Sequence, residues 1–169
     1  LLTVAWAGVV CSKPPMIGIS IRPERYSYGI IERTREFTIN LATAELCRAM
    51  DFCGVKSGRE VDKFAACGLT AIDAPPLQCA PAVAQSPAHL CCAVKDIVPL
   101  GSHDLFLAQV LRVNVGEDYF AADGSIDEGK MQLVGYVHGR YRQLGCELGF
   151  FGYSIASPEA LKRRMSPEM

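Results

Sequence analysis

Two arginines and a serine stand near the start of the chain, where an apolar segment gives way to a helical pattern. Arg22 and Arg25 flank Pro23-Glu24, and Ser27 follows two residues later. A helix N-terminus presents unpaired N–H groups and a partial positive charge, so it attracts anions. Guanidinium and hydroxyl groups add donors suited to phosphate oxygens. Two interpretations follow: an anion site for a phosphate, or two solvated arginines beside an ordinary helix start.

The elements expected to position this junction are two strands and a helix. Residues 3–10 are apolar and partly β-branched, which predicts a buried strand. The run Cys11-Ser12-Lys13-Pro14-Pro15 interrupts it, because proline lacks the N–H that a sheet ladder needs. Residues 16–22 resume as a second strand, and the spacing from Pro23 to Thr34 is helical. If the two strands pair, Lys13 approaches the same site as the arginines.

Downstream, the pattern predicts short strands and a few short helices. Strands are expected over residues 37–41, 89–98, 105–115 and 133–137, with the two long ones forming an antiparallel hairpin. Helices are expected over residues 44–52, capped by Thr43, and from Ser57 to Lys63 or Phe64, with Glu60 completing a capping box. The proline-rich stretch 69–87 is expected to be irregular, with short strands at 69–72 and around Leu77.

This order of elements predicts a mainly β protein. Many short strands without strand–helix alternation favour a closed antiparallel barrel with helical additions over a doubly wound sheet. We expect one domain over residues 1–155 and a C-terminal tail over residues 156–169.

Composition and charge exclude several functions. The net charge of the 169 residues is −1 and no basic stripe occurs, so no nucleic-acid partner is expected. No apolar run approaches the ~20 residues that span a bilayer. No charged leader precedes an apolar region, so we expect a cytoplasmic protein without a membrane segment.

The chain holds eight cysteines, which raises the question of disulfides or a metal. No Cys-x-x-Cys pair and no His/Cys set with zinc spacing occurs, so we expect no metal ligands. Most of the cysteines are interpreted as small buried apolar residues in a reducing compartment, the alternative being a structural zinc or iron–sulfur site. They are Cys11, Cys47, Cys53, Cys67, Cys79, Cys91, Cys92 and Cys146.

Several segments, in order, resemble the flavin reductase-like, FMN-binding split-barrel family and its flavoredoxin-type branch. They are TVAWAG (3–8), SKPP (12–15), ISIRPERYSY (19–28), FTINL (37–41), FCGVKSGREVDKF (52–64) and PLGSHDLFLAQV (99–110). The resemblance covers nearly the whole chain. It implies an antiparallel, Greek-key-like split barrel with FMN as cofactor. It also implies one more strand or hairpin before Thr3, without which a barrel keeps an open sheet edge.

In that family, the backbone at TVAWAG and SKPP runs along the isoalloxazine edge of FMN. By resemblance, the ring-binding residues are Thr3, Val4, Ala5, Trp6, Ala7, Cys11, Ser12 and Lys13. The small side chains among them let a planar ring approach the backbone. Lys13 would stabilise the reduced, anionic flavin. Core packing is the alternative for Trp6, and a redox thiol is the alternative for Cys11.

The resemblance also assigns the phosphate and the histidines. Arg22, Arg25 and Ser27 would bind the FMN phosphate with Tyr26 nearby. Lys56 would reach the phosphate or ribityl region, within one chain or across a dimer interface, or is a plain surface lysine.

His103, in a Gly-x-His turn, would orient the nicotinamide or flavin and stabilise charge; otherwise it bonds its own loop. His138 would be a flavin-side residue or a barrel-end cap, and His89 is interpreted as structural.

Three functions remain open at this point. The first is an FMN-dependent oxidoreductase that uses NADH or NADPH to reduce free flavin, ferric iron or a partner protein. The second is a flavoredoxin-like electron carrier without an efficient nicotinamide site, and the third is a split barrel that no longer binds flavin. In the first two, the flavin performs the redox chemistry and the protein binds and orients it. The resemblance further implies a homodimer with each FMN near the subunit interface, and a small-molecule or protein electron acceptor.

Overall fold

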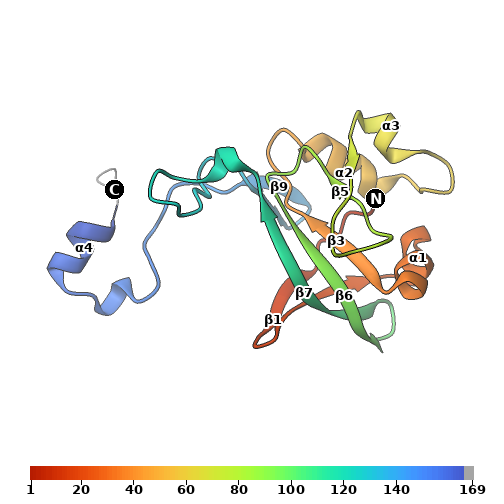
Figure 1. The fold of residues 1–169 in the computed structure, drawn as a ribbon, viewed down its shortest axis with the longest axis horizontal. Coiled ribbons are helices and arrows are strands. Elements are labelled where there is room, and N and C mark those ends of the chain that lie inside the picture. The colour runs from red at the N-terminus through yellow and green to blue at the C-terminus, as the bar shows by residue number, and fades with distance from the viewer. Residues whose placement is uncertain (166–169) are drawn as a thin grey trace.

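The centre of the molecule is one antiparallel sheet, and the computed structural model describes residues 1–165 around it (Figure 1). The five strands follow the order β1-β2-β7-β6-β3. In chain order they are β1 (Ala7–Ser12), β2 (Pro15–Ile21), β3 (Glu36–Asn40), β6 (Ala88–Pro99) and β7 (Asp104–Val115). The expected mainly β, antiparallel fold is confirmed.

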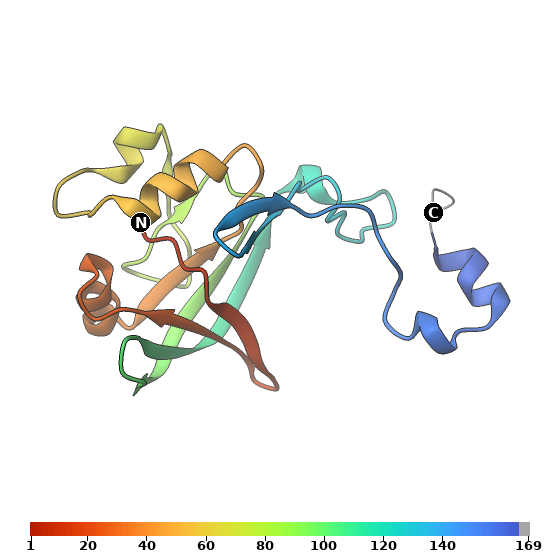
Figure 2. The same cartoon turned by 180° about the vertical axis from the view of Figure 1, so that it is seen from behind.

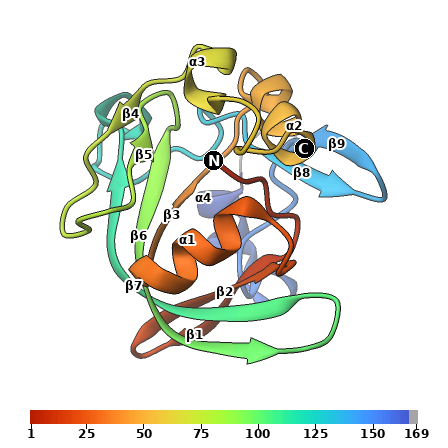
Figure 3. The same ribbon diagram turned by 90° about the vertical axis from the view of Figure 1, so that its right-hand side faces the viewer.

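Strand β7 lies in the middle of this sheet. It forms the expected long hairpin with β6, in which Pro99 pairs with Asp104 and Ala88 with Val115, and it also pairs with β2. Within the described residues, β1 and β3 pair on one side only, and the strongly bent sheet does not close between them (Figure 3). The closed barrel expected from the strand pattern is therefore open between these two edges.

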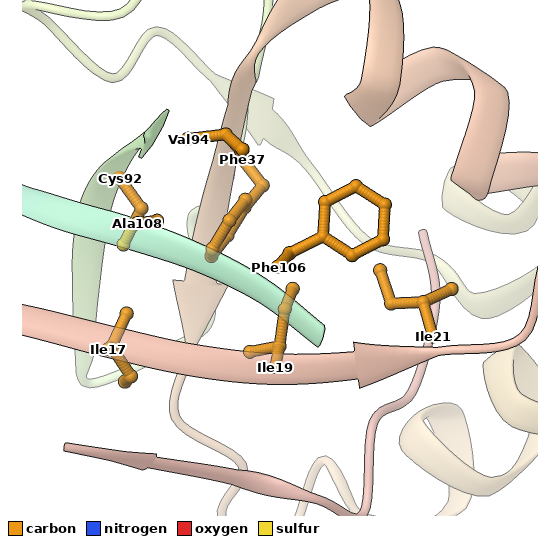
Figure 4. Close-up of a cluster of buried hydrophobic side chains, with 8 residues drawn as sticks. All are labelled: Ile17, Ile19, Ile21, Phe37, Cys92, Val94, Phe106 and Ala108. Carbon is orange, nitrogen blue, oxygen red and sulfur yellow. The ribbon is translucent and has the colours of Figure 1, made fainter. Parts of the chain in front are cut away.

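The core lies on the concave side of the sheet, where alternate residues of the strands point inward. Ile17, Ile19 and Ile21 of β2 face Phe106, which is completely buried (Figure 4). This alternation follows from the two-residue period of a strand. The remaining members of this cluster are Phe37, Cys92, Val94 and Ala108.

The first strand is not buried, and that expectation is wrong. Strand β1 begins at Ala7 rather than at Thr3, and Val9 is 79% exposed. Since β1 is an edge strand that contacts only β2, no layer covers its apolar side chains. Of the two prolines, Pro14 lies in the turn between the strands as expected, whereas Pro15 starts β2 and pairs with Ser12.

Four helices lie in the described residues, one of them packed against the core and the last one away from the sheet. They are α1 (Tyr26–Thr34), α2 (Cys47–Val55), α3 (Lys63–Cys67) and α4 (Pro158–Arg164), with single 3₁₀ turns at η1 (Glu117–Tyr119) and η2 (Tyr153–Ile155). Among the described residues, no helix is long and apolar enough to cross a membrane.

Two helix boundaries differ from the sequence prediction. The Thr43 hydroxyl accepts from the Leu46 N–H and forms a turn, so α2 begins only at Cys47. The helix predicted from Ser57 is wrong, because the Asp62 carboxylate accepts from the N–H groups of residues 64 and 65 and caps α3 instead. A carboxylate at that position also suits the positive end of the helix dipole.

Two small hairpins flank the sheet. Within the irregular stretch, β4 (Ala71–Ile72) pairs with β5 (Ala82–Val83), so the second short strand lies beyond Leu77, which is buried in a satellite core. Strands β8 (Val134–Val137) and β9 (Arg140–Gln143) form a hairpin that the sequence predicted only in part. The Tyr141 hydroxyl donates to Asp51 at 2.7 Å and ties this hairpin to α2.

The chain then leaves the barrel. Residues 145–165 form an arm that carries η2 and α4 and projects away from the sheet (Figures 1 and 2). The Ser157 hydroxyl caps α4 by accepting from the Ala160 N–H. Of the expected C-terminal tail, residues 156–165 form this helix and its flanks, and residues 166–169 lie outside the described residues.

Candidate functional site

A pocket of about 530 Å³ opens where β2 ends and α1 begins. The loop after α2 forms its opposite wall. The sequence predicted five of its residues as a phosphate site, and the structure brings all five together: Arg22, Arg25, Tyr26, Ser27 and Lys56. The rest of the lining is Leu2, Glu24, Ser57, Gly58, Arg59, Glu60 and Lys63.

The N-terminus of α1 opens into this pocket with free donors. Arg25 occupies the N-cap position, and its side chain makes no capping hydrogen bond. Within the described part of the chain, the N–H groups of Tyr26 and Ser27 have no acceptor, whereas the Tyr28 N–H bonds the Arg25 carbonyl. The first turn contains no acidic residue. An anion would therefore meet two unpaired N–H groups and the positive end of the helix dipole.

The pocket carries an excess of positive charge. Five cationic side chains line it against the two carboxylates of Glu24 and Glu60, an excess of three. Glu24 pairs with Arg22 at 3.5 Å, and a backbone hydrogen bond first, then this arginine, lowers the pKa of Glu24. Arg25 is oriented by a bond from its Nη1 to the Gly54 carbonyl at 3.2 Å.

The loop after α2 packs tightly on the first residue of α1. A Cβ atom at Gly58 would lie 2.9 Å from Cδ1 of Tyr26, so only glycine fits without moving that ring. The Arg59 guanidinium carbon lies 5.3 Å from the centre of the Tyr26 ring, a cation–π distance. Arg59 also donates to the Glu24 carbonyl at 3.5 Å. Sequence reasoning missed Arg59, although it lies in the GVKSGRE segment that carried the resemblance.

Lys63 is the second residue that the sequence did not single out. Only 6% of it is exposed, and its Nζ donates to the carbonyls of Cys53 at 2.7 Å and Leu1 at 2.9 Å. Burial lowers the pKa of this ammonium group. Its cation is thus fixed in the floor of the pocket by carbonyls rather than by a carboxylate.

A second, mostly apolar cavity of about 610 Å³ adjoins the charged pocket. Leu2 and Ser27 border both. Three of the predicted ring-binding residues, Thr3, Val4 and Ala7, line this second cavity. The Thr3 hydroxyl donates to the Met50 carbonyl and fixes the segment before β1 against α2.

Trp6 and His103 meet at the rim of the sheet. Their ring centres are 4.6 Å apart at an interplanar angle of 47°. Trp6 is 62% exposed, so the core-packing alternative for it is wrong. His103 Nδ1 lies 3.0 Å from the Ser102 hydroxyl, so it bonds its own loop, as one alternative predicted. Ala5, beside Trp6, is exposed and lines neither cavity.

The tip of the β1–β2 hairpin lies away from the charged pocket. Ser12 pairs with Pro15 and Ala7 with Ile19, so Cys11, Ser12 and Lys13 sit at the end of the hairpin opposite Arg22. At about 3.3 Å per residue, that end is roughly 20 Å away. The expectation that strand pairing brings Lys13 to the arginines is therefore wrong. The ring contacts assigned to these three residues stay predictions.

The other two histidines lie outside both cavities. His138 occupies the β8–β9 turn in a left-handed conformation (φ 49°) and is exposed. His89 Nε2 lies 3.0 Å from the Asn114 amide nitrogen, and burial lowers the pKa of this imidazole, which fits the structural role predicted for it.

The cysteines are only in part the buried residues expected. All eight are free thiols. Cys53, Cys91 and Cys92 are buried, whereas Cys79 and Cys146 are exposed and the others are half-buried. Burial raises the pKa of Cys92 to about 12, so this thiol stays protonated. Within residues 1–165, no three His, Cys, Asp or Glu side chains gather as a metal site would require.

Comparison with known proteins places this fold in a class. The structure is similar to split-barrel flavoproteins, among them flavoredoxin of Desulfovibrio vulgaris (Miyazaki F), with a TM-score of 0.82 and 31% identity over 90% of this chain and 81% of that one. A putative flavin reductase with a split barrel domain from Shewanella frigidimarina has the same fold, with a TM-score of 0.77 and 23% identity over 89% and 76% of the two chains. The expected split barrel is thereby confirmed.

The sequence itself gives the family. Residues 1–145 match the flavin reductase like domain, and the chain belongs to that family. It is also 32% identical over 111 residues to an NADPH-flavin oxidoreductase of Streptomyces viridifaciens, covering 64% of this chain and 56% of that protein. The arm beyond residue 145 lies outside the matched domain.

Proposed function

We propose that this protein binds FMN and acts as an NAD(P)H-dependent flavin or ferric reductase or a related oxidoreductase. The observation that carries the proposal is the pocket at the start of α1, where two unpaired N–H groups and an excess of three positive charges converge. This donor set suits a phosphate monoester, which carries close to two negative charges at neutral pH.

The residues have distinct roles in this proposal. Arg22, Arg25 and Arg59 would hold the phosphate oxygens with Lys56, while the Ser27 hydroxyl stands where the charged pocket meets the apolar cavity. That cavity, lined by the residues before β1, would shelter apolar parts of the cofactor from water. When bound, FMN supplies the redox chemistry by accepting a hydride and passing on electrons.

The pair Trp6–His103 gives the nicotinamide a place to stack. Both rings are at the rim of the sheet, and the Ser102 hydroxyl fixes the imidazole. Aromatic faces bind flat heterocycles by stacking. Hydride transfer needs an oriented substrate rather than a strong base, so His103 would orient the nicotinamide and would not remove a proton.

A second candidate function is an electron carrier. It is supported by the 31% identity to a protein named flavoredoxin, over 90% of this chain. In that case, the protein takes electrons from and gives them to partners without reacting efficiently with NADH or NADPH.

The proposed function also includes an oligomeric state and a cellular location. We propose a homodimer that exchanges electrons with a small-molecule or protein acceptor, with no nucleic acid or membrane involved. We also propose a cytoplasmic location, supported by eight free thiols, of which two are exposed.

An anaerobic visible spectrum tests the proposal. The purified protein is saturated with FMN and then mixed with NADH or NADPH. Bleaching of the flavin band within seconds supports the reductase, and bleaching by dithionite alone supports the carrier. A protein that takes up no FMN contradicts both.

A further inference from the structure

Within residues 1–165, the C-terminal arm (residues 145–165) makes no hydrogen bond to the rest of the chain. Every backbone hydrogen bond of this segment stays inside it, as from Tyr153 to Phe150 and from Leu161 to Ser157. The ribbon leaves the barrel past the β8–β9 hairpin and carries η2 and α4 well away from the sheet (Figures 1 and 2). Among the described residues, the arm therefore adds no hydrogen bond to the barrel to which it is attached.

The arm is nevertheless organised and apolar. The Arg164 guanidinium carbon lies 4.1 Å from the centre of the Phe150 ring, and Phe150 meets Tyr153 edge to face, so α4 folds back on η2. Phe151 is fully exposed and Ile155 is 90% exposed. Apolar side chains held together on a projecting segment mark an interaction surface.

A surface of matching chemistry lies at the far end of β7. Leu111 and Val113 are exposed there, and the loop that follows carries Phe120 and Ile126, which are partners in an isolated β-bridge. The same loop carries carboxylates that form no ion pair within the described residues: Glu117, Asp118 and Glu128. We call this set of seven residues the β7-end surface.

Charge complementarity joins the two regions. The last turn of α4 presents Lys162, Arg163 and Arg164 beside the exposed apolar residues of the arm. The same polypeptide thus carries one apolar surface with a basic rim and another with an acidic rim. When both halves of such a pair lie on one chain, two copies related by a two-fold axis satisfy both pairs at once.

We propose that the arm of one copy docks on the β7-end surface of a second copy, and that the exchange is reciprocal. Phe151 and Ile155 would fill the apolar centre, and the basic turn of α4 would meet Asp118 and Glu128. The proposal gives the interface of the proposed homodimer. It rests on no flavin contact, so its failure is separate from failure of FMN binding.

The first test removes the apolar anchors from the full-length chain. The variant F151E/I155E is compared with V9E/V10E, which places the same charges on exposed apolar residues of β1. Sedimentation equilibrium is expected to show that the arm variant raises the dimer Kd by about 30-fold or more, as the loss of an interface anchor does, and that the β1 variant leaves it unchanged. FMN uptake, measured in parallel, reports that the barrel is folded.

The second test uses charge reversal to identify the occupant. K162E/R163E and D118K/E128K each weaken self-association, whereas an equimolar mixture of the two forms heterodimers, because each arm then meets a surface of opposite charge. A wild-type protein that is monomeric at all concentrations overturns the proposal. So does a dimer that F151E/I155E leaves intact, or a mixture that forms no heterodimer.

Discussion

Strand β2 serves two regions of very different character. Its inward residues, Ile17, Ile19 and Ile21, belong to a buried apolar cluster around Phe106 (Figure 4). One residue after Ile21 the chain enters a charged pocket, where Arg22 and Arg25 are exposed. Many small apolar contacts stabilise the core. Within the described residues, the pocket contains only a few polar contacts, and two of its backbone N–H groups are unpaired.

This contrast distinguishes residues that stabilise the fold from residues that are available for binding. Removing an atom from the core costs burial energy that nothing else replaces. Removing a charge from the pocket costs little in the free protein, since like charges there repel each other and water solvates them. The two regions are adjacent in sequence, yet substitutions in them are expected to affect different measurements.

The largest expected effect is on the core. Phe106→Ala removes a completely buried ring and is expected to lower the free energy of unfolding by about 3–5 kcal/mol. Urea unfolding measures this loss. Val9→Ala, on the exposed edge strand, serves as the control and should change it by less than about 0.5 kcal/mol. If Phe106→Ala lost less than the control, the cluster would not be the core.

The next effect is on the pocket. Arg25→Ala is expected to weaken FMN binding by about 10- to 100-fold, the worth of one charge-assisted hydrogen bond, while unfolding changes little. Arg33→Ala is the matched control, because Arg33 is exposed at the other end of the same helix. Fluorescence titration with FMN measures both. Equal losses in the two variants would mean that the phosphate does not lie at the start of α1.

The third expected effect is on stability, at the hydrogen bond between α1 and β7 that the Tyr28 hydroxyl donates to Asp104 at 2.6 Å. Tyr28→Phe is expected to destabilise the protein by about 1–2 kcal/mol at neutral pH. The hydrogen bond to Asp104 raises the pKa of Tyr28 from 10 to about 12, so its protonated form is favoured by folding. This contribution is complete below pH 10 and is lost as the pH rises towards 12. Unfolding of both proteins at pH 8 and pH 11 should therefore show a smaller difference at the higher pH; a constant difference would argue against this bond.

A smaller effect is expected at the packed loop. Gly58→Ala would push the Tyr26 ring, which a new Cβ would meet at 2.9 Å, and should weaken FMN binding by less than about tenfold. Gly145→Ala is the control, because no atom lies within 4 Å of a Cβ at that position. The same titration distinguishes them, and no loss at Gly58 would show that the Tyr26 ring is not a binding element.

The smallest effect is expected at the hairpin tip. Lys13→Ala should leave FMN affinity within about twofold, because Lys13 lies at the far end of β1 and β2 from the arginines. A large loss would support the ring contact that the resemblance assigns to Lys13, made within one copy or from a partner copy.

The sequence predicted the pocket better than its surroundings. Arg22 to Ser27 form one local turn into a helix, so their proximity needs no knowledge of the fold. Arg59 and Lys63 reach the pocket only because the chain turns back after α2, which no local pattern shows. In the same way, β1 has the composition of a buried strand, but its position at the sheet edge depends on strand order. The expectation for Lys13 is wrong because the full length of β2 separates the hairpin tip from Arg22.

The central position of β7 has a consequence for slow motions of the molecule. β7 is bonded on both sides, whereas β1 and β3 are bonded on one, so local opening starts at the margins of the sheet. Its amide protons are expected to be the last to exchange with solvent. Ile21, the residue before the pocket, pairs with Asp104 of that strand. The turn that carries Arg22 and Arg25 is thus attached to the part of the protein that is expected to open most rarely.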